Sequence, residues 1–308
     1  MNARAYTKKI RTRFQRDVIP ALRRLPWYVN RMVFRTRTIH TQQGIFEIPL
    51  TAPDPISLQL YTKGQFEKDL ADEVLPIVRR LSGLSKGQGI LLDIGANNGV
   101  ISIGMLTNGE MESAIAIEPE PGNFQRLTKN IAHNHLENRI TSLNRALSDR
   151  KGSLTFELSK TNFGDHRVRN GEAHSASGDR YGEAGRTVIS VDAERLDDVI
   201  SRLPAETQSK IALIWMDVQG YEGYVLSGGP NFLSTGIPVC SEVWPYGIKR
   251  SGMSEETFCN LIQQHWTHYW LRRKNGFVRY PISIFPTLFQ ELGYDGASEN
   301  VLLTKERS

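Results

Sequence analysis

The sequence of 308 residues predicts an α/β protein with an open, doubly wound, mostly parallel sheet and a helical, basic N-terminal extension. The first observation is the apolar run 90–94, which is followed by a glycine-rich turn and then by an apolar helical segment. The second is another short apolar run, 114–117, that ends in an acidic residue. The third is the pair of runs 211–216 and 237–244, each of which precedes a helical pattern. Strands that alternate with helices are typical of a parallel sheet.

The charge of the chain is concentrated at its N-terminus. Residues 1–37 contain eleven Lys or Arg and one acid, Asp17, which gives +10, whereas the remainder holds 27 basic and 32 acidic residues, which gives −5. We therefore place a basic amphipathic extension at 1–43 and the main domain at 44–308. An acidic main domain argues against a broad nucleic-acid groove.

The basic segment has a helical pattern, with apolar residues at every fourth position. Such a helix can lie on an anionic membrane surface, pack on the domain or on a second subunit, or form a disordered tail. These alternatives remain open, and peripheral membrane contact through 1–37 is one of them. The repeating apolar residues are Tyr6, Ile10, Phe14 and Val18, and a second segment starting at Pro20 carries Leu22, Leu25, Trp27, Tyr28, Met32 and Phe34.

The main domain begins with a predicted hairpin. Residues 44–50 and 56–61 alternate between apolar and polar, with Pro and Asp between them, which is typical of two paired strands. A helix is predicted over 70–81, and glycines end it before the strand at 90–94.

The turn after that strand discriminates between ligands. A dinucleotide fold needs Gly-x-Gly-x-x-Gly facing a pyrophosphate, but here the spacing is Asp93-x-Gly95-x-x-x-Gly99. The carboxylate of Asp93 would repel a phosphate, yet it would attract an ammonium group or hydroxyls. Glu118, at the end of the second strand, is placed to accept both hydroxyls of a ribose. S-adenosylmethionine has these groups and no phosphate, so the pattern favours it and disfavours NAD.

Further along, the sequence predicts a helix over 122–134 and a third strand over 140–147, whose end would meet an adenine. A polar loop, 159–186, interrupts the domain and lies where a substrate lid could be. Its His166 and His174 are candidate general bases, although loop histidines are more often only solvent-exposed.

The C-terminal half continues the alternation of strands and helices. Asp192 is predicted to cap a helix that runs through Leu203, after a short strand at 187–191. The sequence Asn275-Gly276 between apolar runs indicates a hairpin. The remaining predicted elements are a strand over 153–158, a helix ending near 228, a helix over 254–265, a hairpin over 269–280 and a last strand over 300–304.

Composition also bears on location. Cys240 and Cys259 have no metal-type spacing and do not suggest a disulfide framework, which fits a reducing compartment. No apolar run approaches the ~20 residues needed to cross a bilayer, and the N-terminus has no signal-peptide core. We expect a cytoplasmic protein, with peripheral attachment at the inner face of the membrane as an open hypothesis.

An ordered set of motifs between about residues 60 and 305 resembles the FkbM family of S-adenosylmethionine-dependent methyltransferases. The resemblance implies the class I methyltransferase, Rossmann-like form of the predicted fold, a bacterial protein, and methyl transfer, mostly to hydroxyl groups of sugars, glycolipids, polyketides or other small metabolites. The motifs are Gly64-x-Phe66-Glu67, the turn from Leu92 to Gly99, Ile117-Glu118-Pro119, Asn144-Arg145-Ala146-Leu147, Leu196-Asp197, Asp217-x-x-Gly220-x-Glu222 and Glu242.

The sequence departs from the family at one position. The family usually has Asp-x-Glu-Gly at the fourth strand, whereas this chain has Asp217-Val218-Gln219-Gly220, with glutamine in place of the glutamate. Glutamine keeps the size and hydrogen bonding of glutamate but loses its charge and its ability to act as a base. The predicted cofactor-binding residues are Glu67, Asp93, Gly95, Ala96, Asn97, Asn98, Gly99, Glu118, Pro119, Asn123, Ala146 and Leu147.

Catalysis is assigned to the end of the fourth strand. Asp217 is the candidate base or the ligand of a divalent metal, and Glu242 is a second candidate that contacts the acceptor. Strand-end acids can instead simply cap the following helix. The alternatives are an RNA methyltransferase that uses the basic arm, or, given Gln219, a protein that binds the cofactor without catalysis. A small-molecule or glycan acceptor is expected, with no nucleic acid.

Overall fold

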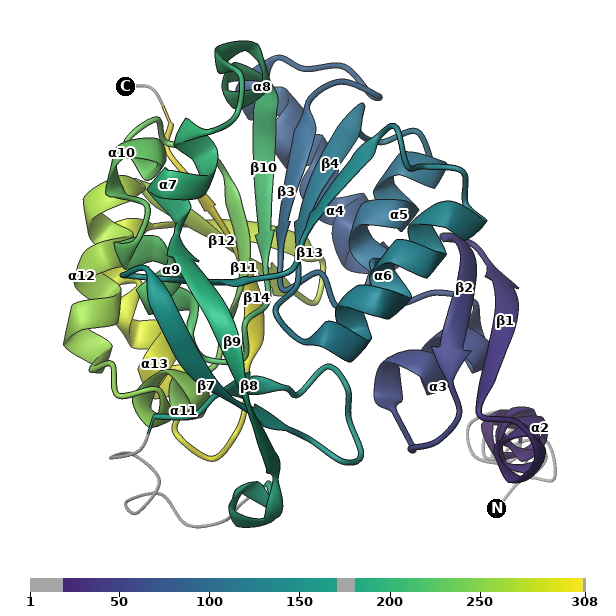
Figure 1. Ribbon diagram of the computed structural model, residues 1–308. Coiled ribbons are helices and arrows are strands. Elements are labelled where there is room, and N and C mark those ends of the chain that lie inside the picture. The colour runs from purple at the N-terminus through teal and green to yellow at the C-terminus, as the bar shows by residue number, and fades with distance from the viewer. Residues whose placement is uncertain (1–18, 171–180, 307–308) are drawn as a thin grey trace, which may run out of the picture.

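Figure 1 shows a computed structural model of the protein, which describes residues 19–170 and 181–306. Its centre is an eight-stranded sheet in the order β13-β12-β14-β11-β10-β3-β4-β5. The five strands from β11 to β5 are parallel, and the other three are antiparallel additions at one edge. The strands are β3 (Ile90–Ile94), β4 (Ser113–Ile117), β5 (Ile140–Leu143), β10 (Ile211–Met216), β11 (Val239–Val243), β12 (His268–Arg273), β13 (Gly276–Pro281) and β14 (Glu299–Thr304).

Helices cover both faces of this sheet, because successive side chains of each buried strand point to opposite sides. Leu92 and Ile94 pack with α7, α9, α10, α12 and α13 on one face, whereas Leu91 packs with α4, α5 and α6 on the other. The predicted doubly wound α/β fold is confirmed. The helices are α4 (Lys68–Ser82), α5 (Val100–Thr107), α6 (Pro121–His133), α7 (Leu196–Ser201), α8 (Ala205–Lys210), α9 (Glu222–Ser227), α10 (Pro230–Leu233), α11 (Pro245–Arg250), α12 (Glu255–His265) and α13 (Pro286–Leu292).

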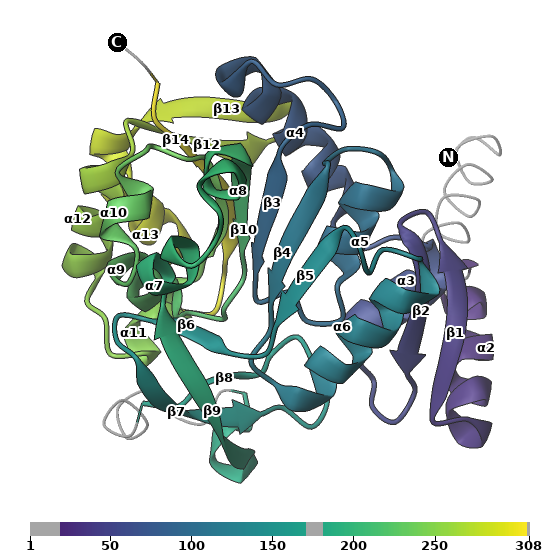
Figure 2. The same cartoon turned by 45° about the horizontal axis from the view of Figure 1, so that its top comes forward.

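A second, four-stranded sheet lies below the carboxyl ends of the main sheet (Figure 2). The prediction of one strand over 140–147 is wrong, because the chain leaves the main sheet after Leu143. The Asn144 side chain donates to the carbonyls of Glu118 and Pro119, which holds the turn at this point. The second sheet contains β6 (Ala146–Ser148), β7 (Gly152–Leu158), β8 (Arg167–Val168) and β9 (Thr187–Arg195).

The predicted helix cap at Asp192 is also wrong. Asp192 pairs with Ser153 in the β7–β9 ladder and is exposed on β9, which continues to Arg195. The helix α7 therefore starts only at Leu196. Extended pairing with a neighbouring strand has overridden a local capping signal.

The hairpin near the start of the domain is not the one predicted. The strand β1 (Thr36–Thr41) pairs with β2 (Gly44–Pro49), so the boundary that we placed after residue 43 falls in the turn between them. Residues 56–61 are not a strand but part of α3 (Pro55–Lys63). The Asp54 carboxylate accepts a hydrogen bond from the Ser57 amide at 2.8 Å, and proline follows at the first helical position.

Within the N-terminal extension, a helix is described as α2 (Ile19–Val33), and the strand β1 follows it. The repeat from Tyr6 to Val18 lies outside the described residues. No helix within the described ranges is both long and apolar enough to span a bilayer.

Candidate cofactor and acceptor pocket

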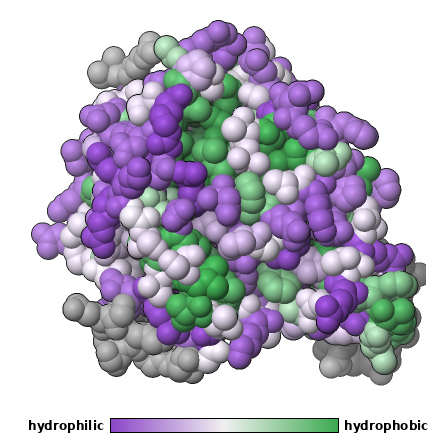
Figure 3. All heavy atoms as spheres, viewed as in Figure 1, coloured by the Kyte–Doolittle hydropathy of each residue, from purple (hydrophilic) through white to green (hydrophobic). Residues whose placement is uncertain are grey.

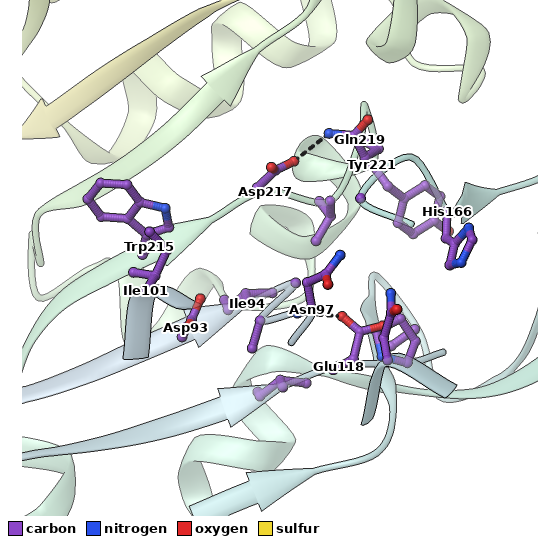
Figure 4. Close-up of a pocket in the computed structure, with 18 of the residues that line it drawn as sticks. Asp93, Ile94, Asn97, Ile101, Glu118, His166, Trp215, Asp217, Gln219 and Tyr221 are labelled. Atoms are coloured by element: carbon purple, nitrogen blue, oxygen red, sulfur yellow. Dashed lines mark hydrogen bonds between the residues drawn. The ribbon is translucent and has the colours of Figure 1, made fainter. Parts of the chain in front are cut away.

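A pocket opens at the carboxyl ends of β3, β4 and β10, where the strand order reverses between β3 and β10 (Figure 4). Ligands of open α/β sheets bind at such a reversal. The pocket has about 860 Å³ of empty volume, the solvent at its mouth included, and β6, β7, β8 and the loop around Phe163 complete its wall.

The turn after β3 can adopt its shape only because Gly95 has no side chain. Its φ of +85° is in the left-handed region, and a Cβ atom there would lie 1.9 Å from the carbonyl oxygen of Asp217. Asn97 follows with φ +51°, a conformation that asparagine tolerates better than most residues. The ends of β3 and β10 can therefore approach each other closely.

Glu118 is held rigidly at the end of β4. Its two carboxylate oxygens accept hydrogen bonds from the amides of Asn97 and Glu120, each at 2.8 Å. Burial raises the pKa of Glu118 to about 7, although these two hydrogen bonds act in the opposite direction. A carboxylate has about four acceptor positions, so positions remain for hydroxyl groups in the pocket.

Two further acids line the pocket beside the turn. Asp93 is buried on β3, and its Oδ2 accepts hydrogen bonds from the hydroxyl and the amide of Ser102, at 2.5 and 3.2 Å. Burial raises the pKa of Asp93 to about 6. Glu67, which precedes α4 with φ +51°, has a pKa raised to about 8 by burial and then by the charges of Asp217 and Asp93.

A cluster of three carboxylates, Asp217, Glu222 and Glu242, follows the ends of β10 and β11. One oxygen of each lies within 4.8 Å of the others. Gln219, with φ +56°, donates from Nε2 to Asp217 at 2.7 Å and to Glu242 at 3.4 Å. Glu222 is fully buried, and its Oε1 accepts from the amides of Val218 and Gly220.

The electrostatics of this carboxylate cluster are dominated by burial. Burial and then the charge of Asp217 raise the pKa of Glu222 to about 7, and burial raises the pKa values of Asp217 and Glu242 too. Nearby carboxylates add to the shift because like charges disfavour ionisation. The cluster can hold a proton at neutral pH, and its oxygens are of the type that a hard divalent cation prefers.

The polar loop closes the pocket at the side of α3 and α6. The carbonyl oxygen of Phe163 accepts from the side-chain amides of Asn97 and Asn123, each at 3.0 Å. The Phe163 amide donates to Asp54 at 2.9 Å. The loop is therefore attached to the turn after β3, to α6 and to the start of α3.

His166 has a defined hydrogen-bonding role. Its Nδ1 accepts from the Ser159 amide at 3.0 Å, and burial lowers the pKa of His166 to about 4. A neutral ring that accepts at Nδ1 carries its proton on Nε2. The geometry makes His166 a donor rather than the general base considered from the sequence, and His174 lies outside the described residues.

The structure brings most of the predicted site residues together. Asn98 and Gly99 do not line the pocket: Asn98 Oδ1 accepts from the Val100 amide, and Gly99 packs on Leu127 at the start of α5. Glu242 lies just outside it, behind Gln219. The predicted residues that do line it are Glu67, Asp93, Gly95, Ala96, Asn97, Glu118, Pro119, Asn123, Ala146, Leu147 and Asp217.

Sequence reasoning missed the apolar wall of the pocket. Ile56 comes from the helix that was predicted as a strand, and Phe163 comes from a loop of polar composition. Phe163, one of two aromatic residues in that polar loop, was the signal that could have indicated it. The other lining residues not predicted for the site include Phe66, Arg145, Val168, Trp215 and Tyr221.

Comparison with known proteins indicates the family of the chain. Residues 93–269, more than half of the chain, match the model of the methyltransferase FkbM domain. The chain is 32% identical over 161 residues to the 2-O-methyltransferase NoeI of Sinorhizobium fredii, and 27% identical over 156 residues to the methyltransferase sdnD of Sordaria araneosa. These matches cover 50% and 45% of this chain and 63% and 59% of those relatives, so the chain spans less than two thirds of their length.

Among solved structures, the methyltransferase FkbM of Methylobacillus flagellatus KT is similar over 91% of this chain and 59% of that one. The identity is 15% and the TM-score is 0.41.

Proposed function

Because the chain belongs to the FkbM methyltransferase family, we propose that it transfers a methyl group from S-adenosylmethionine to a hydroxyl of a sugar, glycolipid, polyketide or other small metabolite. The observation that carries this proposal is the acidic lining of the pocket, whose carboxyl groups a cationic ligand would draw into the ionised form. Glu67, Asp93 and Glu118 line it with raised pKa values, and within the described residues none of them forms an ion pair. Such a pocket favours a cationic ligand and disfavours phosphates.

The residues present fit the cofactor group by group. Glu118 would accept from the ribose hydroxyls, since its two amide contacts hold it in place and leave acceptor positions free. Asp93 and Glu67 would face the ammonium group, and Ala146 and Leu147 offer an apolar surface to the adenine. When bound, S-adenosylmethionine supplies an activated methyl group on a positively charged sulfur.

Asp217 is our candidate for the group that takes the proton of the acceptor hydroxyl. It lines the pocket, and burial raises its pKa toward the range in which a carboxylate is a useful base. The Gln219 amide bonds to Asp217 Oδ1 at 2.7 Å, which favours the ionised form and orients the carboxylate. His166 would orient the acceptor by donating from Nε2.

The cofactor assignment is tested by calorimetry with S-adenosylmethionine. Asp93→Ala and Glu118→Ala should each abolish detectable binding, because each removes a carboxylate that no other group replaces. Glu112→Ala is the matched control, since Glu112 is an exposed acid near the opposite end of β4. Equal binding by all four proteins would refute the assignment.

The catalytic assignment is tested by turnover of a hydroxylated acceptor. Asp217→Asn should lower turnover by about 10²–10⁴-fold and leave cofactor affinity nearly unchanged, because a general base contributes to the chemical step. Asp192→Asn, at an exposed strand position, should keep full turnover. Full turnover in Asp217→Asn would exclude the base, whereas a parent that binds the cofactor but never turns over would favour the binding-only alternative.

A divalent cation is the alternative activator, held by Asp217, Glu222 and Glu242. A metal bound there would lower the pKa of the acceptor hydroxyl directly. Dialysis against a chelator separates the two cases. Turnover that stays unchanged would support Asp217 as the base. Turnover that is lost, and that Mg²⁺ or Mn²⁺ restores, would show that a bound metal activates the acceptor instead.

A further inference from the structure

Where the side chains of α2 are described, from residue 24 onward, one face of the helix attaches it to the protein. Trp27 is fully buried, and its ring centroid lies 5.4 Å from that of Tyr61 on α3. Asn30 donates to the Tyr61 hydroxyl at 3.1 Å, and Arg31 donates to the carbonyl of Leu50 at 3.1 Å. These contacts fix the rotation of the helix about its axis.

The opposite face of α2 is apolar and exposed. Its side chains recur at i, i+3, i+4, i+7 and i+8, the spacing of a stripe that normally faces a core. We call this stripe the outer face of α2. It consists of Leu25, Tyr28, Val29, Met32 and Val33, which are 59%, 49%, 53%, 87% and 69% exposed.

The outer face is large for a protein surface. Phe34, 54% exposed, follows the helix directly, and these six residues are half of the exposed large hydrophobic residues in the described part of the chain. Figure 3 shows the apolar patch at the lower right, over α2. A contiguous exposed patch of this kind marks an interaction surface.

The charge around the outer face identifies the partner. Arg24 and Arg35 are exposed beside it, and neither forms an ion pair with any described residue. Residues 1–37 carry +10 in total. A helix with an apolar face and basic flanks binds the interface of an anionic bilayer, where apolar burial and electrostatic attraction add. Two copies packed through this face would instead bring two strongly basic segments together.

We propose that α2 attaches the protein to anionic membranes, with its outer face in the lipid interface. The pocket would then be close to the bilayer. The helix α2 packs on α3, which contributes Ile56 to the pocket wall, and α2 lies at the same end of the molecule as the carboxyl ends of the strands (Figure 1). This inference does not depend on the methyl-transfer proposal.

Flotation with vesicles of phosphatidylcholine and phosphatidylglycerol tests the attachment on the full chain. The parent should float with anionic vesicles, and less at high salt or with phosphatidylcholine alone. The triple variant Val29→Ser/Met32→Ser/Val33→Ser should bind roughly 100-fold more weakly because it removes three apolar side chains without changing charge. The matched control, Val188→Ser/Val278→Ser/Ile284→Ser, changes three exposed apolar residues elsewhere and should float like the parent.

Folding of every variant is checked by its melting temperature. Arg24→Gln/Arg35→Gln keeps the outer face and should lower binding only to anionic vesicles. A parent that does not float, or a triple variant that floats like the parent, would overturn the proposal. A different outcome is that the parent forms a dimer in analytical ultracentrifugation, that the triple variant loses this dimer, and that the parent binds no vesicles. That combination would assign the face to a second copy of the chain.

Discussion

The protein contains two buried groups of carboxylates, which differ in how their charge is balanced. The first, around Glu157 and Glu183, lies between β7, β8 and α11, and arginines surround it. Arg167 contacts Asp165 at 2.8 Å, Glu183 at 3.4 Å and Glu157 at 3.5 Å, and Arg250 contacts Glu183 at 2.8 Å. The second is the pocket group, with Asp217, Glu222 and Glu242 at its centre.

No arginine or lysine forms an ion pair with the pocket group within the described residues. Burial raises the pKa values of its members, that of Glu222 to about 7, so Glu222 can exchange a proton near neutral pH. Paired charges hold the small sheet against α11, whereas unpaired charges leave capacity for a proton or a cation, which is the usual sign of an active site.

The largest expected change in folding stability comes from a substitution in the paired group around Glu157 and Glu183. Glu157→Gln leaves buried arginines without their partner and should lower the free energy of unfolding by about 3–5 kcal/mol. Urea denaturation measures it. Glu206→Gln, which breaks an exposed pair with Lys210, should leave stability unchanged within error. A similar result for both variants would mean that the buried pairing does not stabilise the fold.

In the pocket group, replacing a carboxylate is expected to stabilise the protein rather than destabilise it, and the size of this effect depends on pH. Because the pKa of Glu222 is 4.5 when unfolded and about 7 when folded, the folded state holds a proton that the unfolded state has lost. The contribution of Glu222 to folding stability is therefore fully present below pH 4.5 and is lost as the pH rises through 7. Glu222→Gln should have little effect at pH 5 and should raise the free energy of unfolding by about 3 kcal/mol at pH 8.

Denaturation curves of parent and variant at the two pH values decide this prediction. Glu157→Gln is the control, since it should destabilise at both. Destabilisation by Glu222→Gln at pH 8 would show that a cation compensates the ionised group.

The smallest effect concerns Gln219, which donates to Asp217. Gln219→Glu removes this donor and adds a charge, so the pKa of Asp217 should rise further. The acidic limb of the pH–turnover profile should move up by about one pH unit. Gln219→Met removes the donor without adding charge and should cause a smaller shift. Identical profiles in all three proteins would mean that Asp217 does not titrate during turnover.

The features that the sequence predicted correctly are local ones. The strands β3, β4 and β10 are short apolar runs, and the cap of α12 follows from Ser254, whose hydroxyl accepts from the Thr257 amide. Asp93 and Glu118 could be placed because each ends or nearly ends such a run. The errors arose where a capping residue outweighed an apolar alternation, at Asp54, and where a partner strand outweighed a capping signal, at Asp192.

The sequence by itself determined the parallel core of the main sheet, the glycine turn and the opposite charges of residues 1–37 and of the rest of the chain, because periodicity, turn geometry and composition are properties of neighbouring residues. Tertiary structure alone decided that Asp217, Glu222 and Glu242 meet, that Gln219 bridges two of them, and that arginines compensate only the other acidic group. It also decided that Trp27 faces the protein while its apolar neighbours face outward. These outcomes depend on which distant elements pack together, and burial then sets the charge that each site can hold.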